Sequence, residues 1–159
     1  MDVQIRKATA ADVPAIADLL RALGLFAHLN AETSQATEDR LRKHLALAAS
    51  DNSHLVLVAL DPRGKLLGYG AVHWLPYLIL AGPEGYVSEL FIKEEFRGQG
   101  VGGRLLDAIK TEARDRGCSR LMLLNMRRRE SYQRGFYLKQ GWTERSDAAN
   151  FILPLAEED

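Results

Sequence analysis

"EEFRGQGVGGRLLDAIK", residues Glu94 to Lys110, places a glycine-rich segment directly before a pattern typical of an amphipathic helix. Four of the six residues from Gly98 to Gly103 are glycines, and apolar residues then recur at every fourth position: Val101, Leu105, Ile109 and Ala113. Because glycine has no Cβ, the backbone N–H groups of such a segment can approach a ligand closely. The first N–H groups of a helix also lack internal acceptors and lie at the positive end of its dipole. The segment therefore predicts a binding site for an anion such as phosphate.

Two common phosphate-binding patterns fit this segment poorly. Gly98, Gly100 and Gly103 match the dinucleotide fingerprint G-x-G-x-x-G, which also needs an acidic residue about 20 positions later, at the end of the next strand. The next predicted strand, RLMLLNM, carries no acid, and KEEF separates the preceding strand from the glycines. In the P-loop pattern, Arg104 and Leu105 stand where a lysine and a magnesium-binding hydroxyl belong. The sequence therefore disfavours a nicotinamide dinucleotide and argues against a P-loop.

The composition predicts a soluble protein of one domain, residues 1–159, with no preference for nucleic acid or for a membrane. The length suffices for one core, and 21 Lys and Arg residues balance 21 Asp and Glu residues. The longest apolar run, LVLVAL, is far too short to cross a bilayer, and the first residues lack the apolar core of a signal peptide. The single cysteine, Cys118, excludes an internal disulfide framework and fits a reducing compartment. We therefore expect a cytoplasmic protein.

The histidines give no support for a metal site. His28, His44, His54 and His73 are scattered along the chain, with no pair at helical ligand spacing and no cysteine nearby. We expect them to be surface or strand residues.

Apolar periodicity and turn residues predict an α/β domain around a mixed sheet. One predicted strand contains Val3 and Ile5, and the others occupy residues 54–60, 65–74, 85–92, 120–125 and 150–155. DPRG, with proline at its second position, makes the second and third strands a hairpin. The predicted helices run from the capping pattern Thr9–Asp12 to Gly24, from Thr37 to Ala49, from the glycine loop to Gly117, and from Ser131 to Gln140.

A third pattern, R-x-x-G-x-G, fits the glycine loop through Arg97, Gly100 and Gly102. Because this pattern lies between a predicted strand and a predicted helix, it resembles the pyrophosphate loop of the GNAT superfamily of acyl-CoA-dependent N-acetyltransferases. SELFIKEEFRGQGVGGRLL resembles the central strand, loop and helix of that family, FYLKQGW its later aromatic signature, and IRKATAADVPAIADLL its opening strand and helix. The resemblance covers nearly the whole chain. It implies a mostly antiparallel central sheet, flanked by helices, whose central strands splay apart.

The resemblance also implies acetyl-CoA as cosubstrate and no metal. The loop N–H groups would hold the pyrophosphate, and the strand before the loop would lend its backbone to the pantetheine arm. One N–H group of that strand would face the thioester oxygen as an oxyanion hole. Asn125, at the end of the splayed neighbouring strand, would hydrogen-bond to the same arm. The predicted cofactor-binding residues are Leu90, Phe91, Ile92, Arg97, Gly98, Gln99, Gly100, Val101, Gly102, Gly103, Arg104 and Asn125.

Two catalytic side chains are predicted, Glu89 and Tyr137. An alkyl amine has a pKa of about 10.4, so it arrives protonated and needs a base. Glu89 lies where the family often carries a carboxylate; an ion-paired surface residue is the alternative reading, and Glu84 or a water relay could serve instead. Tyr137 occupies the signature's tyrosine position. Because a phenol has a higher pKa than a thiol, we expect Tyr137 to donate a hydrogen bond to the developing thiolate. Tyr132 is a spare candidate.

The acceptor is left open by the sequence. Phe26, His28, Trp74 and Tyr77 belong to segments that border the acceptor pocket in the family, which suits a small apolar or aromatic amine but equally suits core packing. The arginine run 127–129 is either a solvated loop or a contact for CoA phosphates or an acidic acceptor. Cys118 lies about 25 Å from the loop, at the far end of the helix, and is expected to be structural.

We therefore expect an N-acetyltransferase in which a primary amine of a small molecule or peptide attacks acetyl-CoA directly. A non-catalytic acyl-CoA-binding or sensor domain of the same fold is the alternative. The family also implies that the chain can form a homodimer.

Overall fold

The structure, a computed structural model, describes residues 2–155. The chain forms two compact units, divided between Leu124 and Asn125. The first unit holds a five-stranded sheet and the longer helices, and the second holds two short helices and a C-terminal segment. Within the described residues, no helix combines the length and the apolar character that crossing a membrane requires.

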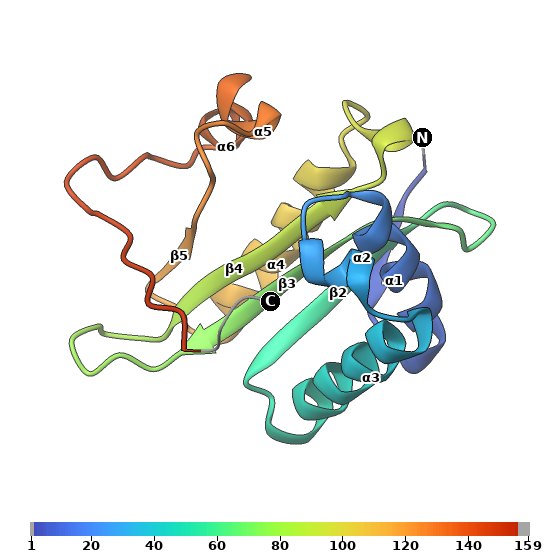
Figure 1. The fold of residues 1–159 in the computed structure, drawn as a ribbon. Coiled ribbons are helices and arrows are strands. Elements are labelled where there is room, and N and C mark those ends of the chain that lie inside the picture. The colour runs from blue at the N-terminus through green and yellow to red at the C-terminus, as the bar shows by residue number, and fades with distance from the viewer. Residues whose placement is uncertain (1, 156–159) are drawn as a thin grey trace. The chain divides into compact units, whose positions relative to one another are not determined.

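The sheet of the first unit is mixed and mostly antiparallel (Figure 1). Its strands lie side by side in the order of the sequence: β1 (Gln4–Lys7), β2 (His54–Leu60), β3 (Leu66–Leu75), β4 (Glu84–Ile92) and β5 (Arg120–Leu123). The first three pairings are antiparallel, and only β4 and β5 run parallel. The predicted α/β class is confirmed, as is the hairpin that joins β2 and β3 through DPRG.

The neighbouring strands β4 and β5, of which β5 forms the edge of the sheet, separate part-way along their length. Their pairing begins at Glu84 and Arg120 and stops at Val87 and Leu123, whereas β4 continues to Ile92. From Ser88 onward, the edge of β4 that faces away from β3 therefore carries no neighbouring strand among the described residues. This is the splay that the family resemblance implies, and it leaves backbone groups free to pair with a ligand.

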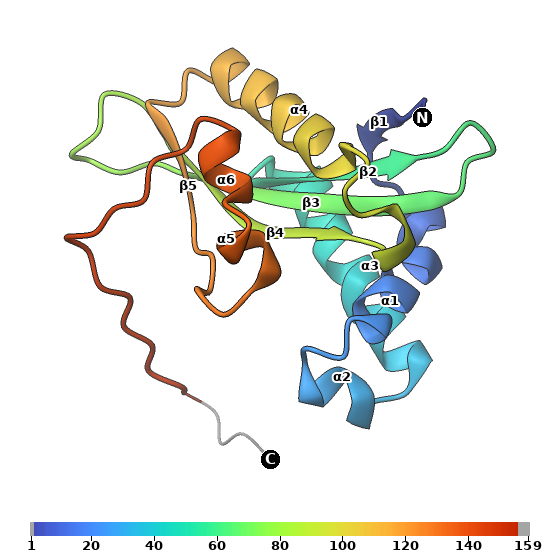
Figure 2. The ribbon, with the colours of Figure 1, turned by 90° about the horizontal axis from the view of Figure 1, so that it is seen from above.

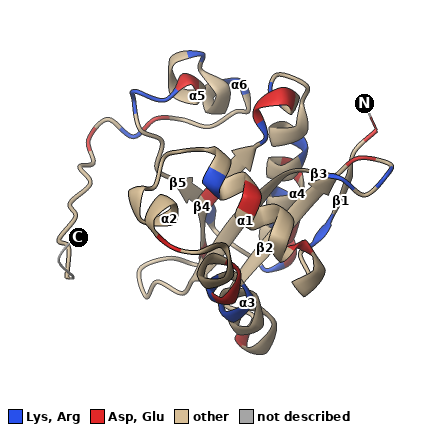
Figure 3. Ribbon diagram, turned by 45° about the vertical axis from the view of Figure 1, so that its right-hand side comes forward, with Lys and Arg blue, Asp and Glu red and all other residues tan. Residues whose placement is uncertain are grey.

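Helices cover both faces of this sheet (Figure 2). One face carries α4 (Val101–Asp115), and the other carries α1 (Val13–Ala22), α2 (Ala27–Ala31) and α3 (Ser34–Asp51). Because both faces are covered, β2 and β3 are buried almost throughout, which explains why their sequences read as continuous apolar runs. The short helix α2 was not predicted from the sequence. Helix α3 carries both acidic and basic residues, and Arg42 pairs with Glu38 on it (Figure 3).

The start of α1 follows the capping pattern expected from Thr9 and Asp12. The Asp12 carboxylate accepts a hydrogen bond of 2.7 Å from the Thr9 backbone N–H and two from the Arg6 guanidinium, at 2.7 and 2.8 Å. These bonds tie β1 to α1. The helix then buries one face, including Ile16 and Leu20, against the sheet.

The second unit differs from the sequence predictions in two respects. The helix predicted from Ser131 to Gln140 is divided into α5 (Glu130–Gln133) and α6 (Phe136–Lys139), because Gly135 adopts φ 65° and ends the first turn. The strand predicted at 150–155 is wrong. This segment forms no strand, and Phe151, Ile152, Leu153 and Leu155 are exposed. Its apolar composition favours a strand, but a strand also needs a partner for its backbone groups.

Candidate active site

The loop between β4 and α4 has a backbone that glycine makes possible. A single 3-10 turn, Glu94–Phe96, leads into it, and Gly98 and Gly100 have φ of 73° and 82°. Gly100 is the N-cap of α4 in the left-handed conformation. Residues with a Cβ rarely adopt these angles, so the glycines are required by the shape of the loop.

This loop presents six consecutive N–H groups that have no acceptor. Among the described residues, none of the backbone N–H groups from Gly98 to Gly103 donates a hydrogen bond, and Arg104 N–H is the first that does, to Gly100 O at 3.1 Å. Helix starts leave N–H groups unpaired in general, but here the unpaired run extends through the preceding turn. Six unpaired donors at the positive end of a 15-residue helix could together bind an anion.

The polar side chains of the loop are held away from these N–H groups. Arg97 Nε donates to Ile92 O at 3.2 Å, and Gln99 Nε2 donates to Glu95 O at 2.9 Å, so both close the loop against the turn before it. Arg104 is exposed, and its side chain forms no hydrogen bond or ion pair with any described residue. Its charge is therefore available to a ligand at the helix start.

Strand β4 directs alternate side chains to the two sides of the sheet. Leu90 and Ile92 lie on the side of α4, because a Cβ at the neighbouring Gly70 would meet Leu90 and Ile109, and one at Gly68 would meet Ile92. Phe91 lies on the opposite side, where its ring meets those of Phe26 and Tyr69 at centroid distances of 6.0 Å. Glu89 shares that side.

On that side of the sheet, α1, α2 and α3 enclose a cavity of about 320 Å³ above β2, β3 and β4. Its lining is largely apolar, with a few polar groups, as is usual for a site that binds a small molecule. The apolar lining residues are Ile16, Leu20, Phe26, Leu29, Leu41, Leu45, Val56 and Ala71, and the polar ones are His28, Arg40, His44, His54, Tyr69, His73 and Glu89.

Glu89 is the only carboxylate that lines this cavity among the described residues. The hydroxyl of Tyr69 donates a hydrogen bond of 3.0 Å to Glu89 Oε1, and Oε2 forms no hydrogen bond with a described residue. Burial, together with the negative charge of Glu89, raises the pKa of Tyr69. Tyr69 therefore remains a donor that orients the carboxylate, and one carboxylate oxygen stays free to accept a proton.

Two of the four residues that sequence analysis placed near an acceptor line this cavity, namely Phe26 and His28. The other two do not. Trp74 belongs to the opposite face, where the Arg116 guanidinium lies 4.6 Å from the centre of its ring, and Tyr77 is exposed in the loop after β3. Trp74 is an even-numbered residue of β3, whereas the cavity is lined by the odd-numbered Tyr69, Ala71 and His73.

All four histidines line the cavity, although the sequence scatters them. The rings of His54 and His73, on β2 and β3, stack with centroids 5.0 Å apart and planes inclined by 16°. His54 Nε2 lies 3.2 Å from His44 O, and Nδ1 lies 3.0 Å from Ser53 Oγ. Because a carbonyl oxygen can only accept, Nε2 of His54 carries the hydrogen of the first bond. Burial, with added effects of His54 and His44, lowers the pKa of His73.

The hairpin register could have revealed this pairing. If the residues on the two sides of the DPRG turn are paired one by one, the expected partner of His54 lies one or two positions before His73. A bulge between Ala59 and Leu60 then fixes His54 opposite His73. A slip of one residue would have turned one of the rings to the other face.

No group of three or more His, Cys, Asp or Glu residues within 2–155 is placed to hold a metal ion.

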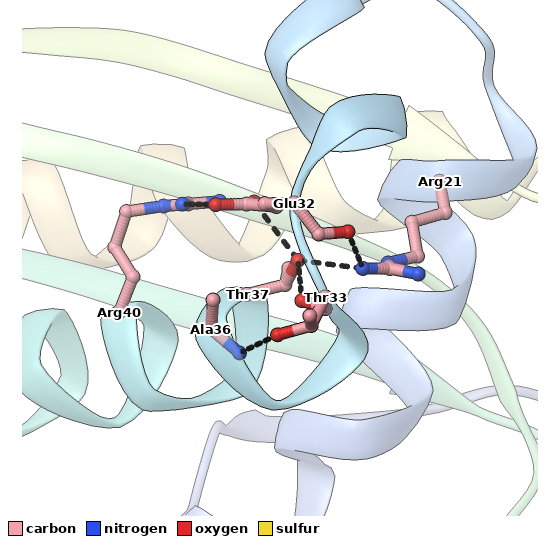
Figure 4. A network of polar contacts seen from close by, with 6 residues as sticks. All are labelled: Arg21, Glu32, Thr33, Ala36, Thr37 and Arg40. Carbon is pink, nitrogen blue, oxygen red and sulfur yellow. Dashed lines mark hydrogen bonds and ion pairs between the residues drawn. The ribbon is translucent and has the colours of Figure 1, made fainter.

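Arg40, the one guanidinium among the described residues that line the cavity, is neutralised by a carboxylate (Figure 4). Arg40 Nη1 and Nη2 donate to the two oxygens of Glu32 at 2.6 and 2.7 Å, and Thr37 Oγ1 donates to the same carboxylate at 2.9 Å. Arg40, with Thr37, lowers the pKa of Glu32 to about 2. Arg21 bonds to Glu32 O and Thr37 Oγ1, so the network fixes the corner between α2 and α3.

Glu84, the alternative base, has a structural role. It is the first residue of β4, is almost completely buried, and forms an ion pair with Arg120 Nε of β5. Its carboxylate is already partnered at the point where β4 and β5 are still paired.

Cys118 follows Gly117 after the end of α4. Burial raises the pKa of its thiol, which is the opposite of what a nucleophile needs.

In the second unit, Tyr137 lies on α6 between two aromatic rings. Its ring meets Phe136 at 4.9 Å and Trp142 at 6.1 Å, both near perpendicular, and its hydroxyl has no hydrogen-bond partner among the described residues. Burial raises the pKa of Tyr137 to about 12. The spare candidate, Tyr132, is instead committed, because its hydroxyl donates to Glu144 Oε2 at 2.9 Å.

Two further predicted contacts belong to this unit. Ser131 Oγ donates to Asn125 Oδ1 at 3.1 Å, which leaves the amide nitrogen of Asn125 as a donor. In the arginine run, Arg127 pairs with Glu144 at 2.7 Å and stacks 5.9 Å from the ring of Tyr132. At least this arginine is part of the unit's own structure.

Residues 18–142 match the sequence profile of the acetyltransferase (GNAT) family. The chain belongs to this family. It is an acyltransferase, and GNAT acetyltransferases use acetyl-CoA as their cosubstrate. Among curated relatives, glucosamine 6-phosphate N-acetyltransferase 1 of Oryza sativa subsp. japonica is 33% identical over 135 residues, which cover 82% of this chain and 79% of that protein. A thialysine N-epsilon-acetyltransferase of Bos taurus is 28% identical over 127 residues, which cover 76% of this chain and 73% of that protein.

Solved structures of GNAT proteins share the fold. The glucosamine-6-phosphate N-acetyltransferase of Arabidopsis thaliana superposes with a TM-score of 0.75 at 18% identity, covering 97% of this chain and 100% of the other. An aminoglycoside acetyltransferase from an uncultured soil metagenomic sample reaches a TM-score of 0.77 at 20% identity, covering 97% of each chain. The fold and the class of reaction are therefore confirmed.

Proposed function

We propose that this GNAT acetyltransferase moves an acetyl group from acetyl-CoA to a primary amine of a small molecule or peptide, by direct attack of the amine on the thioester carbonyl. One arrangement carries the proposal. Strand β4 bears Glu89 inside the cavity, continues along the open edge from Ser88 to Ile92, and runs into the loop of unpaired N–H groups. The proposed sites for the amine, the pantetheine arm and the phosphates thus follow one another along β4 and the loop after it.

The loop fits the pyrophosphate of coenzyme A. Six N–H donors and the positive end of α4 match the charge and the acceptor oxygens of a diphosphate, and Gly98 and Gly100 keep side chains out of the way. Arg104 adds a free positive charge. We assign the pyrophosphate contacts to residues Arg97, Gly98, Gln99, Gly100, Val101, Gly102, Gly103 and Arg104.

The open edge of β4 fits the pantetheine arm. Backbone N–H and C=O groups of Leu90, Phe91 and Ile92 would pair with the amides of the arm, as a neighbouring strand would. A backbone N–H in this stretch would polarise the thioester carbonyl and stabilise the negative charge that develops on its oxygen. The amide nitrogen of Asn125, which is not used within the second unit, is assigned to the same arm.

Glu89 is the proposed general base. The amine must lose a proton before its lone pair can attack, and the free Oε2 of Glu89 accepts that proton directly or through one water molecule. The nitrogen then bonds to the carbonyl carbon and the C–S bond breaks. A largely apolar cavity excludes other water, which protects the thioester from hydrolysis.

Tyr137 is the proposed donor to the sulfur atom. With its pKa raised to about 12, the phenol lies more than three units above a thiol, so complete proton transfer costs about 5 kcal/mol. A hydrogen bond to the developing thiolate carries no such cost, and the Tyr137 hydroxyl has no competing partner among the described residues. The proton that the sulfur finally receives therefore comes from solvent or from the base.

Release of free thiol from acetyl-CoA in the presence of a panel of primary amines tests this function. We expect turnover with at least one amine and binding of acetyl-CoA, seen as heat in a calorimeter. Absence of any binding of acetyl-CoA would overturn the assignment of the loop, and release that does not depend on an amine would overturn direct attack.

A further inference from the structure

The histidines occupy a defined place relative to Glu89. Val56, Ala71 and Glu89 are register partners on β2, β3 and β4 and form one row across the floor of the cavity. His54 and His73 form the next row, two residues or ~7 Å along the strands. An amine held at Glu89 therefore has a pair of imidazoles beside the rest of its molecule. His44 and His28 close the cavity from α3 and α2.

Of this pair, His73 is the ring that can bind a ligand. Both nitrogens of His54 are engaged, with His44 O and Ser53 Oγ, whereas neither nitrogen of His73 forms a hydrogen bond with a described residue. Stacking against His54 fixes the plane of the His73 ring without using its nitrogens. His73 is thus an oriented, unused donor in the lining of the cavity.

The carboxylates of Glu32 and Asp51 interact with His28 and His54 through space, without a direct bond. Among the described residues no Asp or Glu forms a hydrogen bond or ion pair with any of the four histidines, and the nearby Glu32 is occupied by Arg40. Burial, with smaller contributions from the neighbouring imidazoles of His54 and His44, lowers the pKa of His73. A negative group among them would reverse this effect, because it favours the protonated, doubly donating ring.

Resting on the acetyl-transfer function proposed above, we propose that the acceptor amine also carries an acidic group, a carboxylate or a phosphate, and that His73 contacts this group while the amine lies at Glu89. The names of the two curated relatives agree with this class. Thialysine is an amino acid and so carries a carboxylate, and glucosamine 6-phosphate carries a phosphate, each besides a primary amine. His73 is then a residue that determines specificity and leaves the chemistry to Glu89.

Matched pairs of amines test the proposal. Thialysine is compared with its primary amide, and glucosamine 6-phosphate with glucosamine, so that only the acidic group changes within each pair. We expect the acid of at least one pair to bind at least tenfold more tightly than its neutral partner, by calorimetry without acetyl-CoA, and to show the lower KM. The pair that discriminates identifies the group as carboxylate or phosphate.

The variant His73→Phe keeps a flat ring for stacking but removes both nitrogens. We expect it to lose most of the preference for the acid over the neutral partner. His73→Gln, which restores an N–H donor, should recover part of the preference. Equal binding of acid and neutral partner in both pairs by the wild-type protein overturns the proposal, as does a preference that survives in a folded His73→Phe variant. Binding is measured without turnover, so a failure of acetyl transfer remains distinguishable from a failure of this assignment.

Discussion

The glycine loop and the histidine-lined cavity both present hydrogen-bond donors to a ligand, but they are built differently. The loop uses backbone N–H groups from six consecutive residues, Gly98 to Gly103. The cavity uses side chains from α1, α2, α3, β2, β3 and β4, and its four histidines span residues 28 to 73. A site made of consecutive backbone groups suits the diphosphate of coenzyme A, which is the same whatever the acceptor is. A site made of distant side chains can change its ligand by single substitutions, which suits the acceptor.

The largest expected effect concerns Glu89, which lines the cavity and lies on the strand that leads into the glycine loop. Glu89→Gln removes the base but keeps the acceptor for the Tyr69 hydroxyl, so kcat should fall by about 10²- to 10⁴-fold with little change in acetyl-CoA affinity. Steady-state kinetics and calorimetry measure the two quantities. The control is Glu94→Gln, an exposed carboxylate further along the same segment, which should leave kcat unchanged. Equal kcat values for Glu89→Gln and wild type would exclude Glu89 as the base.

The next effect concerns the loop alone. Gly100→Ala places a Cβ on a residue with φ 82°, so the N-cap of α4 shifts and the N–H groups lose their alignment. We expect the Kd for acetyl-CoA to rise about 10- to 100-fold, as for the loss of charged hydrogen bonds. Gly64→Ala is the matched control, because Gly64 has φ 79° in the exposed DPRG turn and open space around it. Both variants should lose similar stability, and only the first should lose affinity; a loss in both would point to strain rather than to the ligand.

Tyr137→Phe should have an effect of similar size, but on kcat instead of on the affinity for acetyl-CoA. Loss of a hydrogen bond to a developing thiolate is expected to lower kcat about 10- to 100-fold at unchanged acetyl-CoA affinity. Because burial raises the pKa of Tyr137 to about 12, its hydroxyl stays protonated, and it causes no decline of kcat between pH 7 and about pH 10. Tyr132→Phe is the control, since that hydroxyl is bound to Glu144. If the two variants have the same kcat, Tyr137 has no special role.

The smallest effect on activity is expected at Asp12, the N-cap of α1. Helix α1 contributes Ile16 and Leu20 to the lining of the cavity. Asp12→Asn weakens the bonds from Arg6 and should lower the free energy of unfolding by about 1–2 kcal/mol at pH 7, with kcat nearly unchanged.

The effect of this substitution should depend on pH. Arg6, with the Thr9 N–H, holds the pKa of Asp12 below its ordinary value, so its stabilisation is complete above about pH 4 and is lost as the pH falls further. The free energies of urea unfolding of variant and wild type should therefore differ at pH 7, and this difference should shrink as the pH falls below about 4. A constant difference would assign the effect to packing.

The sequence predicted the fold well where the signals were local. Strand β2 and the start of α4 fall where apolar runs and glycines placed them, and the DPRG hairpin formed. It failed where the outcome depends on a partner. The apolar segment 150–155 has no strand to pair with among the described residues, and the short helix α2 has too few residues to show a period. Trp74 belongs to a segment expected to border the acceptor, yet it lies on the other face of the sheet, because a shift of one residue decides the side of a strand.

By itself, the sequence determined the glycine loop and the family, because both are carried by contiguous residues, and the backbone geometry of the loop follows from glycine and from the start of a helix. The tertiary structure alone decided that four scattered histidines share one cavity with Glu89, and that Tyr69 holds this carboxylate. Those contacts depend on strand register, on a bulge at Ala59 and on helices that pack over the sheet. Such features arise from the packing of the whole chain, and no short segment encodes them.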